Sequence, residues 1–381
     1  MNKALSPDLL DELQKDAASV WPENFDEIEE MFNRCCFSMA FSAVKKFGLF
    51  TEKGDFETVE SIDGKIKIFK DARYLFDNIL RILVEEKVLE KRDGGFLCVD
   101  PDPYIETPAE ILVTATRKFK NEGAPFQWLA RAQDGLVDFI KGNLYAEEVM
   151  FPMGSFKLVE EVYNTSDVYG FYSRLAGKVV KRIISEYFSS EHFNSKVTML
   201  ETGAGTGNGT ANVLSESDGK FSKYYFTDIS KSLVQMGRRR FKKQGYDFID
   251  YMTFDACDDL TVQGFKEDSV DIVLAVNVLH ATDNIMTALK NIRGLLKKDG
   301  VLVLSELSPP ENGIYRYMEL TFGLLPSYSV YSDRDIRPVA PIIRPDAWMA
   351  AVKDAGFENV AMVPDKRDSA MDRGGVIIAV K

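Results

Sequence analysis

Histidine, cysteine and tryptophan are scarce in this sequence, with two, four and three copies among 381 residues. No cluster of His, Cys or acidic residues has the spacing of metal ligands, so we expect no metal site. The cysteines are Cys35, Cys36, Cys98 and Cys257. Because the adjacent Cys35 and Cys36 cannot readily bridge to each other, we interpret all four as buried thiols in a reducing compartment.

Basic residues are also in short supply. The sequence holds 47 Lys and Arg against 59 Asp and Glu, which gives a net charge of −12. This charge argues against nucleic acid as a partner, because phosphate binding requires a basic face. No apolar run reaches membrane-spanning length, and the polar, acidic N-terminus lacks the pattern of a signal peptide. We therefore expect a cytoplasmic protein with no membrane partner.

Length and composition predict two domains. A chain of 381 residues is too long for one nucleotide-binding domain, and a hydrophobic content of 45% supports an ample core. We expect a mainly helical lid or substrate domain over residues 1–185 and an α/β core over residues 186–381.

The first predicted domain contains a winged-helix-like portion, at about 25–100. Apolar periodicity predicts helices over residues 25–50 and 69–87. Two alternating runs around Asp93-Gly94-Gly95 then predict a β-hairpin. Such modules bind DNA in some proteins, but the acidic balance of this chain favours a packing role.

The rest of the chain is organised around a glycine-rich stretch, Met199 to Gly209. The apolar run 197–200 predicts a strand that leads directly into Gly203, Gly205 and Gly207, and a helix can begin after them. The glycines permit a tight turn and let backbone N–H groups approach a ligand that a Cβ would hold off. The triplet alone does not separate this site from a dinucleotide site.

The order of the later strands is more specific. The predicted strand 224–228 ends in Asp228, which can accept hydrogen bonds from the ribose hydroxyls of an adenosine. Asp255 ends a third apolar run, where its carboxylate can meet the adenine amine. Further strands are predicted over 270–278, 301–305, 360–363 and 375–380.

With Glu201 closing the first strand, this order resembles the class I S-adenosylmethionine-dependent methyltransferases. The resemblance implies a Rossmann-like, mostly parallel seven-stranded sheet with an antiparallel last strand, preceded here by the helical lid domain.

One of the two histidines has a strand-end position. His280 follows the fourth predicted strand and Glu306 the fifth, and open α/β sheets bind ligands beyond the carboxyl ends of their strands. A carboxylate beside an imidazole holds its tautomer and raises its basicity, which suits a general base. The alternative is that His280 caps the next helix and Glu306 binds solvent. His192 lies in a polar stretch and is expected at the surface.

Several longer motifs point to a narrower family. They are Leu200–Gly207, Phe226–Ser230, Gln263–Phe265, Asp271–Thr282 and Leu295–Gly300, and the match extends through 149–155, Tyr163, 322–326, Trp348 and Gly356-Phe357. These motifs resemble the methyltransferase domains of modular polyketide synthases over residues 145–381. The Asn-x-Leu-His-Ala-Thr run at 277–282 is much more specific than the glycine loop.

The family resemblance implies S-adenosyl-L-methionine as cofactor and a β-ketoacyl thioester on an acyl carrier protein, held by its phosphopantetheine arm, as substrate. Other polyketide synthase domains would be further partners. It implies methylation of the α-carbon, with His280 and Glu306 as the proton-removing dyad. The implied cofactor-binding residues are Glu201, Gly203, Gly205, Gly207, Asp228, Asp255, Ala256 and Asn277. The implied substrate-lining residues are Tyr163, Tyr169 and Asn277.

The sequence departs from the family at two places. Pro326–Ser329 stands where members often have Gly-Trp-Trp, and many members have an asparagine near the position of Tyr172. Both places touch the acceptor pocket or lid, so O-methylation of a β-hydroxyl or enol oxygen is the alternative to C-methylation. A non-catalytic binding domain and, more distantly, a winged-helix regulator are two further hypotheses.

Two further features each allow two interpretations. The tyrosine-dense stretch 163–172 either packs between domains, with its hydroxyls at the rim, or covers the cofactor and orients the substrate. The basic run Arg238–Lys243 ends a predicted helix, where the helix dipole favours cations. We interpret this run as a solvated helix end, with a docking patch for an acidic partner as the alternative.

Overall fold

The computed structural model describes residues 5–188, 196–217, 220–311, 313–365 and 373–381. The chain divides into two compact units. We call them the sheet unit (Met1–Glu23, Tyr169–Asn312 and Tyr331–Lys381) and the helical unit (Asn24–Val168 and Gly313–Val330).

The sheet unit is built on a sheet whose described residues form seven strands in the order β6-β5-β4-β7-β8-β10-β9. Strands β6, β5, β4, β7 and β8 pair in parallel, whereas β10 is antiparallel to both of its neighbours. The predicted class I sheet with an antiparallel last strand is therefore confirmed. The strand bounds are β4 Val197–Thr202, β5 Phe221–Asp228, β6 Ile249–Thr253, β7 Val270–Val276, β8 Leu296–Leu307, β9 Glu358–Val363 and β10 Gly374–Val380.

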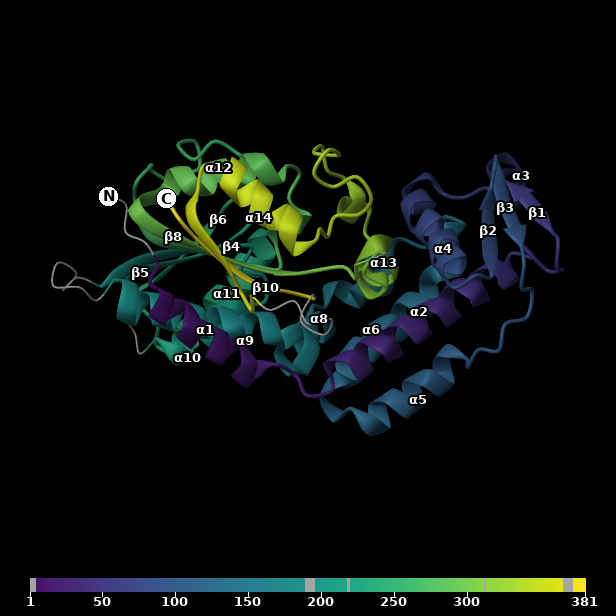
Figure 1. Ribbon diagram of the computed structural model, residues 1–381, viewed down its shortest axis with the longest axis horizontal. Helices are drawn as coiled ribbons and strands as arrows, with labels where there is room; N and C mark the ends of the chain where they lie inside the picture. Colours follow the sequence, from purple (N-terminus) through teal and green to yellow (C-terminus); the bar gives the residue numbers. More distant parts are fainter. Residues whose placement is uncertain (1–4, 189–195, 218–219, 312, 366–372) are drawn as a thin grey trace. The chain divides into compact units, whose positions relative to one another are not determined.

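Helices cover both faces of this sheet. Figure 1 shows α12 and α14 on one side and α1, α9 and α10 on the other. The bounds are α1 Pro7–Val20, α9 Asp167–Arg182, α10 Asn208–Glu216, α11 Lys231–Lys243, α12 Ile285–Leu295 and α14 Pro345–Asp354, with a π-turn η4 Ile183–Tyr187 and a 3-10 turn η5 Leu279–Ala281.

The predicted domain boundary at residue 185 differs from the division into units. Helix α1 belongs to the sheet unit, where Trp21 makes an edge contact with the ring of Phe171, with centroids 4.9 Å apart. The Arg182 guanidinium at the end of α9 also donates to Asp16 of α1 at 2.6 Å. The late segment 313–330 joins the helical unit. Local sequence patterns do not reveal that a segment packs with residues far from it in the sequence.

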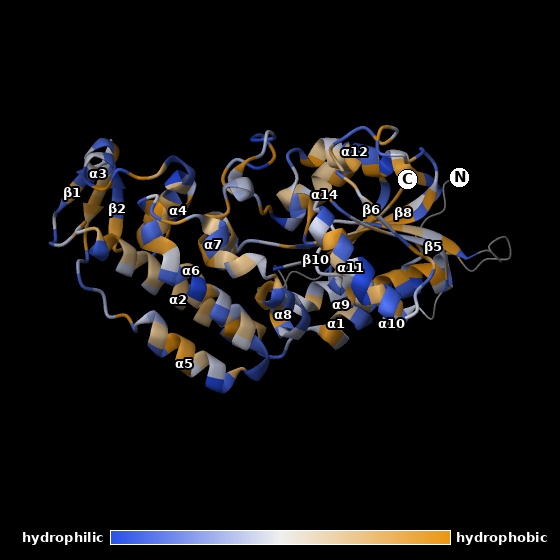
Figure 2. Ribbon diagram, turned by 180° about the vertical axis from the view of Figure 1, so that it is seen from behind, coloured by the Kyte–Doolittle hydropathy of each residue, from blue (hydrophilic) through white to orange (hydrophobic). Residues whose placement is uncertain are grey.

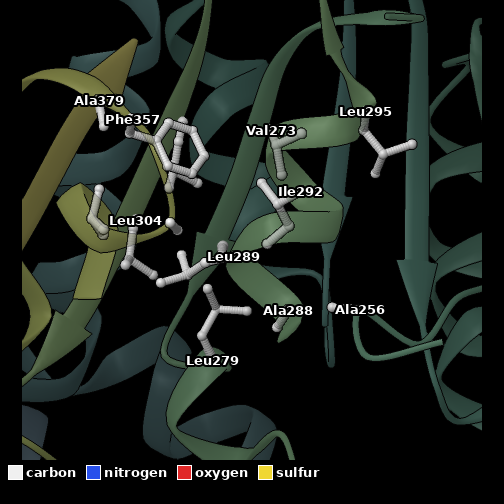
Figure 3. Packing of buried hydrophobic residues seen from close by; sticks show 14 of the residues in the cluster. Ala256, Val273, Leu279, Ala288, Leu289, Ile292, Leu295, Leu304, Phe357 and Ala379 are labelled. Carbon is white, nitrogen blue, oxygen red and sulfur yellow. The ribbon is translucent and has the colours of Figure 1, made fainter. Parts of the chain in front are cut away.

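One apolar core packs α12 and α14 against the central strands of the sheet. Strand residues two positions apart, such as Leu302 and Leu304 of β8, are buried on the same face. Helix α12 meets them with residues three and four positions apart, among them Leu289 and Ile292. Figure 3 shows Leu304, Leu289 and Ile292 in this core, together with Phe357. Fully burying each such side chain contributes roughly 1.5–3 kcal/mol, so the ends of the central strands are firmly placed.

The helical unit combines long helices with a small sheet, ordered β1-β3-β2. The predicted hairpin around Asp93-Gly94-Gly95 is confirmed, because β2 and β3 pair antiparallel and Gly94 has a φ of +77°. The bounds are α2 Phe25–Lys46, β1 Phe56–Thr58, α3 Val59–Ile66, α4 Arg73–Glu85, β2 Leu89–Arg92, β3 Gly95–Cys98, α5 Pro108–Lys118, α6 Gly123–Ile140, α7 Ala146–Met150, α8 Lys157–Thr165 and α13 Arg316–Thr321, with 3-10 turns η1 Lys70–Ala72, η2 Lys120–Glu122, η3 Pro152–Gly154, η6 Phe322–Leu324 and η7 Pro326–Ser329.

The segment that departs from the family pattern, Pro326–Ser329, lies inside the helical unit. The buried carboxylate of Glu319 in α13 accepts hydrogen bonds from Tyr328 at 3.0 Å, Tyr74 at 2.6 Å and Asn78 at 2.9 Å. Tyr328 therefore helps to satisfy a buried charge, which burial without partners would make costly.

Figure 2 shows both hydrophobic and hydrophilic colours on the helices, as expected for helices with one buried side. In the part of the chain that the structure describes, no helix is both long and apolar enough to span a membrane.

Candidate active site

The glycine turn after β4 needs glycine for two reasons. Gly203, Gly205 and Gly207 all have positive φ, at +60°, +55° and +83°. A Cβ on Gly203 would lie 2.0 Å from Cγ2 of Val278, and one on Gly207 would lie 2.7 Å from Cε2 of Phe241. The chain thus passes so close to Val278 and Phe241 here that a side chain on Gly203 or Gly207 would require them to shift.

Asp228 closes β5 beside this turn. Its Oδ2 accepts the backbone N–H of Gly205 at 2.9 Å and its Oδ1 that of Ser230 at 2.8 Å. The side chain is buried, and burial raises the pKa of Asp228 above its ordinary value. The predicted ribose-binding carboxylate is therefore bonded directly to the predicted glycine loop.

Glu201, at the end of β4, accepts hydrogen bonds from side chains of the sheet unit. Its Oε2 accepts the hydroxyl of Tyr224 at 2.5 Å and that of Thr210. A Cβ on Gly209 would lie 2.3 Å from Oε1, so α10 begins directly against this carboxylate. Burial raises the pKa of Glu201 to about 7. Glu201 thus joins β4, β5 and α10, in addition to its predicted contact with a cofactor.

Asp255 and Ala256 follow β6. The Oδ1 of Asp255 accepts the N–H of Cys257 at 2.8 Å, and its backbone exchanges hydrogen bonds with the Gln263 side chain at 2.7 and 2.9 Å. The carbonyl of the buried Ala256 accepts the side-chain amide of Asn291 at 2.9 Å. These contacts give the loop one fixed form at the carboxyl end of its strand.

His280 and Glu306 form the predicted pair. Nδ1 of His280 lies 2.6 Å from Oε2 of Glu306, and both side chains are buried. The Oε1 of Glu306 accepts the N–H groups of Leu279 at 2.8 Å and Val278 at 3.1 Å. Both oxygens of Glu306 are therefore bonded, and its contact with Nδ1 fixes the orientation of the imidazole.

The alternative for His280 and Glu306 does not match the geometry. Helix α12 is capped by Asn284, whose side chain accepts the N–H of Thr287 at 2.9 Å. Glu306 is 3% exposed and bonds His280 in place of solvent.

Asn277 sits between the ends of β7 and β8. It has a φ of +49°, which is uncommon for a residue other than glycine. Its N–H donates to the carbonyl of Ser305 at 2.7 Å, and its Oδ1 accepts the N–H of Leu307 at 3.0 Å. Its amide group is therefore partly engaged in holding the strand ends together at the site.

The predicted tyrosines lie in both units. Tyr163 is half-buried in α8 of the helical unit, whereas Tyr169 is buried in α9 of the sheet unit. The Tyr172 hydroxyl donates to the carbonyl of Arg373 at 2.7 Å, which is a packing role. The roles of Tyr163 and Tyr169 toward substrate stay predictions, and His192 lies outside the described residues.

Sequence reasoning missed two arginines near the site. Arg240 donates to the carbonyl of Thr206 in the glycine turn at 2.8 Å, so the basic run is more than a solvated helix end. Its other basic members, Arg238, Arg239, Lys242 and Lys243, are exposed. The buried Arg337 donates to the carbonyl of His280 at 2.8 Å. Neither contact has a local sequence signal.

Apart from Tyr169, the predicted site residues of the sheet unit lie at or just after the carboxyl ends of the parallel strands β4, β5, β6, β7 and β8, so they share one edge of the sheet. Among the described residues, no group of three or more His, Cys, Asp or Glu is placed to hold a metal ion. The edge thus offers a glycine cradle, a buried acid and an imidazole–carboxylate pair.

Known proteins resemble this chain in sequence. A family model for a methyltransferase domain matches residues 200–302. Polyketide synthase PksR of Bacillus subtilis (strain 168) is 28% identical over 338 residues, covering 86% of this chain and 13% of PksR. Methyltransferase calH of Penicillium decumbens is 36% identical over 242 residues, covering 61% of this chain and 59% of calH. The chain therefore spans less than two thirds of either relative.

Solved structures share the fold over nearly the whole chain. The CurJ carbon methyltransferase matches with a TM-score of 0.87 and 24% identity, covering 98% of this chain and 97% of that one. The trans-methyltransferase CalH in complex with SAH matches with a TM-score of 0.68 and 25% identity, covering 94% and 92%. The fold is that of the class I methyltransferases, which agrees with the sheet order above.

Proposed function

We propose that this chain, an S-adenosylmethionine-dependent methyltransferase similar to the methyltransferase domains of polyketide synthases, methylates the α-carbon of a β-ketoacyl thioester. The acyl group would be carried on the phosphopantetheine arm of an acyl carrier protein, in the cytoplasm, with other synthase domains as further partners. The relatives that carry this proposal are polyketide synthases and a trans-methyltransferase.

The observation that supports the reaction best is the buried contact of 2.6 Å between His280 Nδ1 and Glu306 Oε2. A carbon flanked by a ketone and a thioester is acidic enough for a histidine base to deprotonate. A general base of this kind contributes roughly 10²–10⁴-fold to rate.

The cofactor would be held by the residues of the glycine turn and by Asp228. The turn suits an adenosyl ligand because Gly203, Gly205 and Gly207 have positive φ and carry no Cβ, which lets a ligand approach the backbone closely. Asp228 fits because its buried carboxylate lies at the strand end where ribose hydroxyls bind in such folds. Asp255 would meet the adenine amine.

The proposed mechanism assigns one proton transfer to this chain. S-adenosylmethionine supplies an electrophilic methyl group on a sulfonium. His280 takes the α-proton at Nε2, because Nδ1 is occupied by Glu306, and the resulting imidazolium is stabilised by the carboxylate. The enolate carbon would then accept the methyl group that bound S-adenosylmethionine supplies, with S-adenosylhomocysteine as the leaving group. Burial of His280 and Glu306 keeps bulk water away from the base.

Methylation of a β-hydroxyl or enol oxygen is the second candidate. It is favoured by the Pro326–Ser329 segment, which replaces the Gly-Trp-Trp of the resembling family. The same base can remove a hydroxyl proton, so the acceptor must be decided by experiment.

An intact-mass assay with two carrier-bound substrates separates these candidates. The chain is incubated with S-adenosylmethionine and either a β-ketoacyl or a β-hydroxyacyl carrier protein. A gain of one methyl on the ketone substrate, located on carbon by NMR, supports the proposal. A gain on the hydroxy substrate alone transfers the proposal to oxygen, and turnover of either substrate excludes a non-catalytic domain.

His280→Ala tests the base in the same assay. We expect a loss of roughly 10²–10⁴-fold in turnover with cofactor binding retained. His192→Ala is the matched control, because it removes the other histidine of the chain. Equal turnover in the His280→Ala variant and this control would overturn the assignment of the base.

A further inference from the structure

A buried ion pair, Arg337 with Asp333, contacts the turn that carries His280. Arg337 and Asp333 come from the segment that follows Tyr331, and the Arg337 side chain is completely buried. The Nε of Arg337 donates to Oδ1 of Asp333 at 2.6 Å. All of the groups described below belong to the sheet unit.

The guanidinium of Arg337 donates to two backbone carbonyls in the segment 279–283, which carries His280. Its Nη1 donates to the carbonyl of His280 at 2.8 Å and its Nη2 to the carbonyl of Asp283 at 2.9 Å. The last carbonyls of a helical turn have no partner within the turn itself. The planar fork of arginine, with its donors in a fixed geometry, satisfies two of them at once.

Asp333 extends the same contact to the next helix. Its Oδ2 accepts the N–H of Ile285 at 2.7 Å, at the first residue of α12. Together with Arg337, this carboxylate links the turn 279–283 and the start of α12 to the segment after Tyr331. The ring of Tyr331 lies 4.2 Å from the Arg337 guanidinium and 3.8 Å from that of Arg334.

Stability alone does not account for such a pair. Taking two charges out of water is expensive, and replacing a buried ion pair by apolar residues is often neutral or stabilising. What the pair supplies here is a single backbone conformation at His280. The imidazole is held at Nδ1 by Glu306 of β8, and the main chain of the same residue is held by Arg337.

We propose that Arg337, held in place by Asp333, is a positioning residue that keeps the His280 imidazole bonded to Glu306. The part of this proposal that concerns rate rests on the proposed function, in which His280 is the base. The part that concerns the His280–Glu306 contact does not depend on any substrate.

The low number of histidines permits a direct test. The full chain carries two histidines, so histidine-labelled protein gives two imidazole spin systems, which the His192→Ala variant assigns. We expect a downfield Nδ1 proton for His280, because it is shared with a carboxylate at 2.6 Å. Glu306→Gln serves as the reference for loss of this signal.

Arg337→Lys is the principal variant, because it keeps the charge opposite Asp333 but lacks the fork. We expect the Nδ1 proton signal of His280 to broaden or disappear and kcat to fall roughly 10- to 100-fold, the scale of small misplacements of reacting groups. The KM for S-adenosylmethionine should change by less than about twofold. Arg337→Ala should have a larger effect in the same direction.

Arg334→Ala is the matched control. It removes the other guanidinium beside Tyr331, and Arg334 is exposed, whereas Arg337 is the buried residue that donates to the His280 carbonyl. This control should keep the His280 signal. An unchanged His280 signal in both Arg337 variants overturns the proposal. A lost signal with unchanged methyl transfer would instead overturn the assignment of His280 as the base.

Discussion

Two glutamates close strands at the same edge of one sheet, Glu201 at the end of β4 and Glu306 near the end of β8. Both are almost fully buried, at 1% and 3% exposure. Their donors differ in kind. Backbone N–H groups bond both carboxylates, but the side-chain donors are the hydroxyls of Thr210 and Tyr224 at Glu201 and the imidazole of His280 at Glu306.

The difference shows that position and burial do not define the role of a strand-end carboxylate. Hydroxyl donors tie Glu201 to its neighbours in the fold, and burial raises its pKa to about 7. Glu306 instead acts on a titratable partner, which it orients through Nδ1. We therefore expect substitutions at Glu201 to change stability and substitutions at Glu306 to change turnover.

The largest effect is expected for Glu306→Gln. The carboxylate accepts at both oxygens, from Leu279 at Oε1 and from His280 at Oε2, so an amide must turn its NH₂ toward one donor. Turnover should fall roughly 10²–10⁴-fold, measured by intact mass at saturating S-adenosylmethionine. The Glu201→Gln variant is the comparison: its predicted contact is with the cofactor, so a loss of affinity is overcome at saturating S-adenosylmethionine and most of its turnover should remain. Similar losses in both variants would break the distinction between the two carboxylates.

A pH effect is expected next, at Glu201. Its pKa in the folded chain is about 7 against an ordinary value of 4.5, so the folded state holds a proton that the unfolded state has released between these values. The contribution of Glu201 to stability is therefore fully present below pH 4.5 and is lost as the pH rises through 7. The shift corresponds to something on the order of 3 kcal/mol.

Thermal unfolding from pH 4.5 to 8 measures this contribution as the difference between the unmodified chain and Glu201→Gln. The pKa of Asp228 is also raised, and its effect has the same sign, but it remains in both proteins and cancels in the difference. Identical pH profiles would show that Glu201 is not the group that titrates.

The smallest of the three effects is expected at Gly203, which follows the strand of Glu201 and packs against Val278 beside Glu306. Its φ is +60°, and a Cβ there would lie 2.0 Å from Val278, whose N–H donates to Glu306. Gly203→Ala should weaken binding of S-adenosylhomocysteine by about 1–3 kcal/mol, measured by calorimetry. Adding Val278→Ala should restore part of the affinity.

Gly245→Ala separates strain from contact. Gly245 has a φ of +84° and no heavy atom within 4 Å of an added Cβ, so this variant should bind the ligand normally. If Val278→Ala restores no affinity in the Gly203→Ala chain, the contact with Val278 is not the cause of the loss.

Much of the site was predictable because its signals are local. The glycine spacing, the acid closing β5 and the His280 motif each follow a recognisable strand, and parallel strands bring their carboxyl ends to one edge. The contact between His280 and Glu306, 26 residues apart, follows from that rule alone. The roles of Tyr163 and Tyr169 stay predictions, because those residues fall in different units.

By itself the sequence determined the class of sheet, its glycine turn and the pair at its edge, because strand periodicity and strand-end chemistry are carried by neighbouring residues. The tertiary structure alone decided that Tyr224 binds Glu201, that Arg240 binds the glycine turn and that Arg337 binds His280 across 57 residues. Such contacts depend on how buried polar groups find partners after packing, and nothing in the local pattern of an arginine or a tyrosine records which partner that will be.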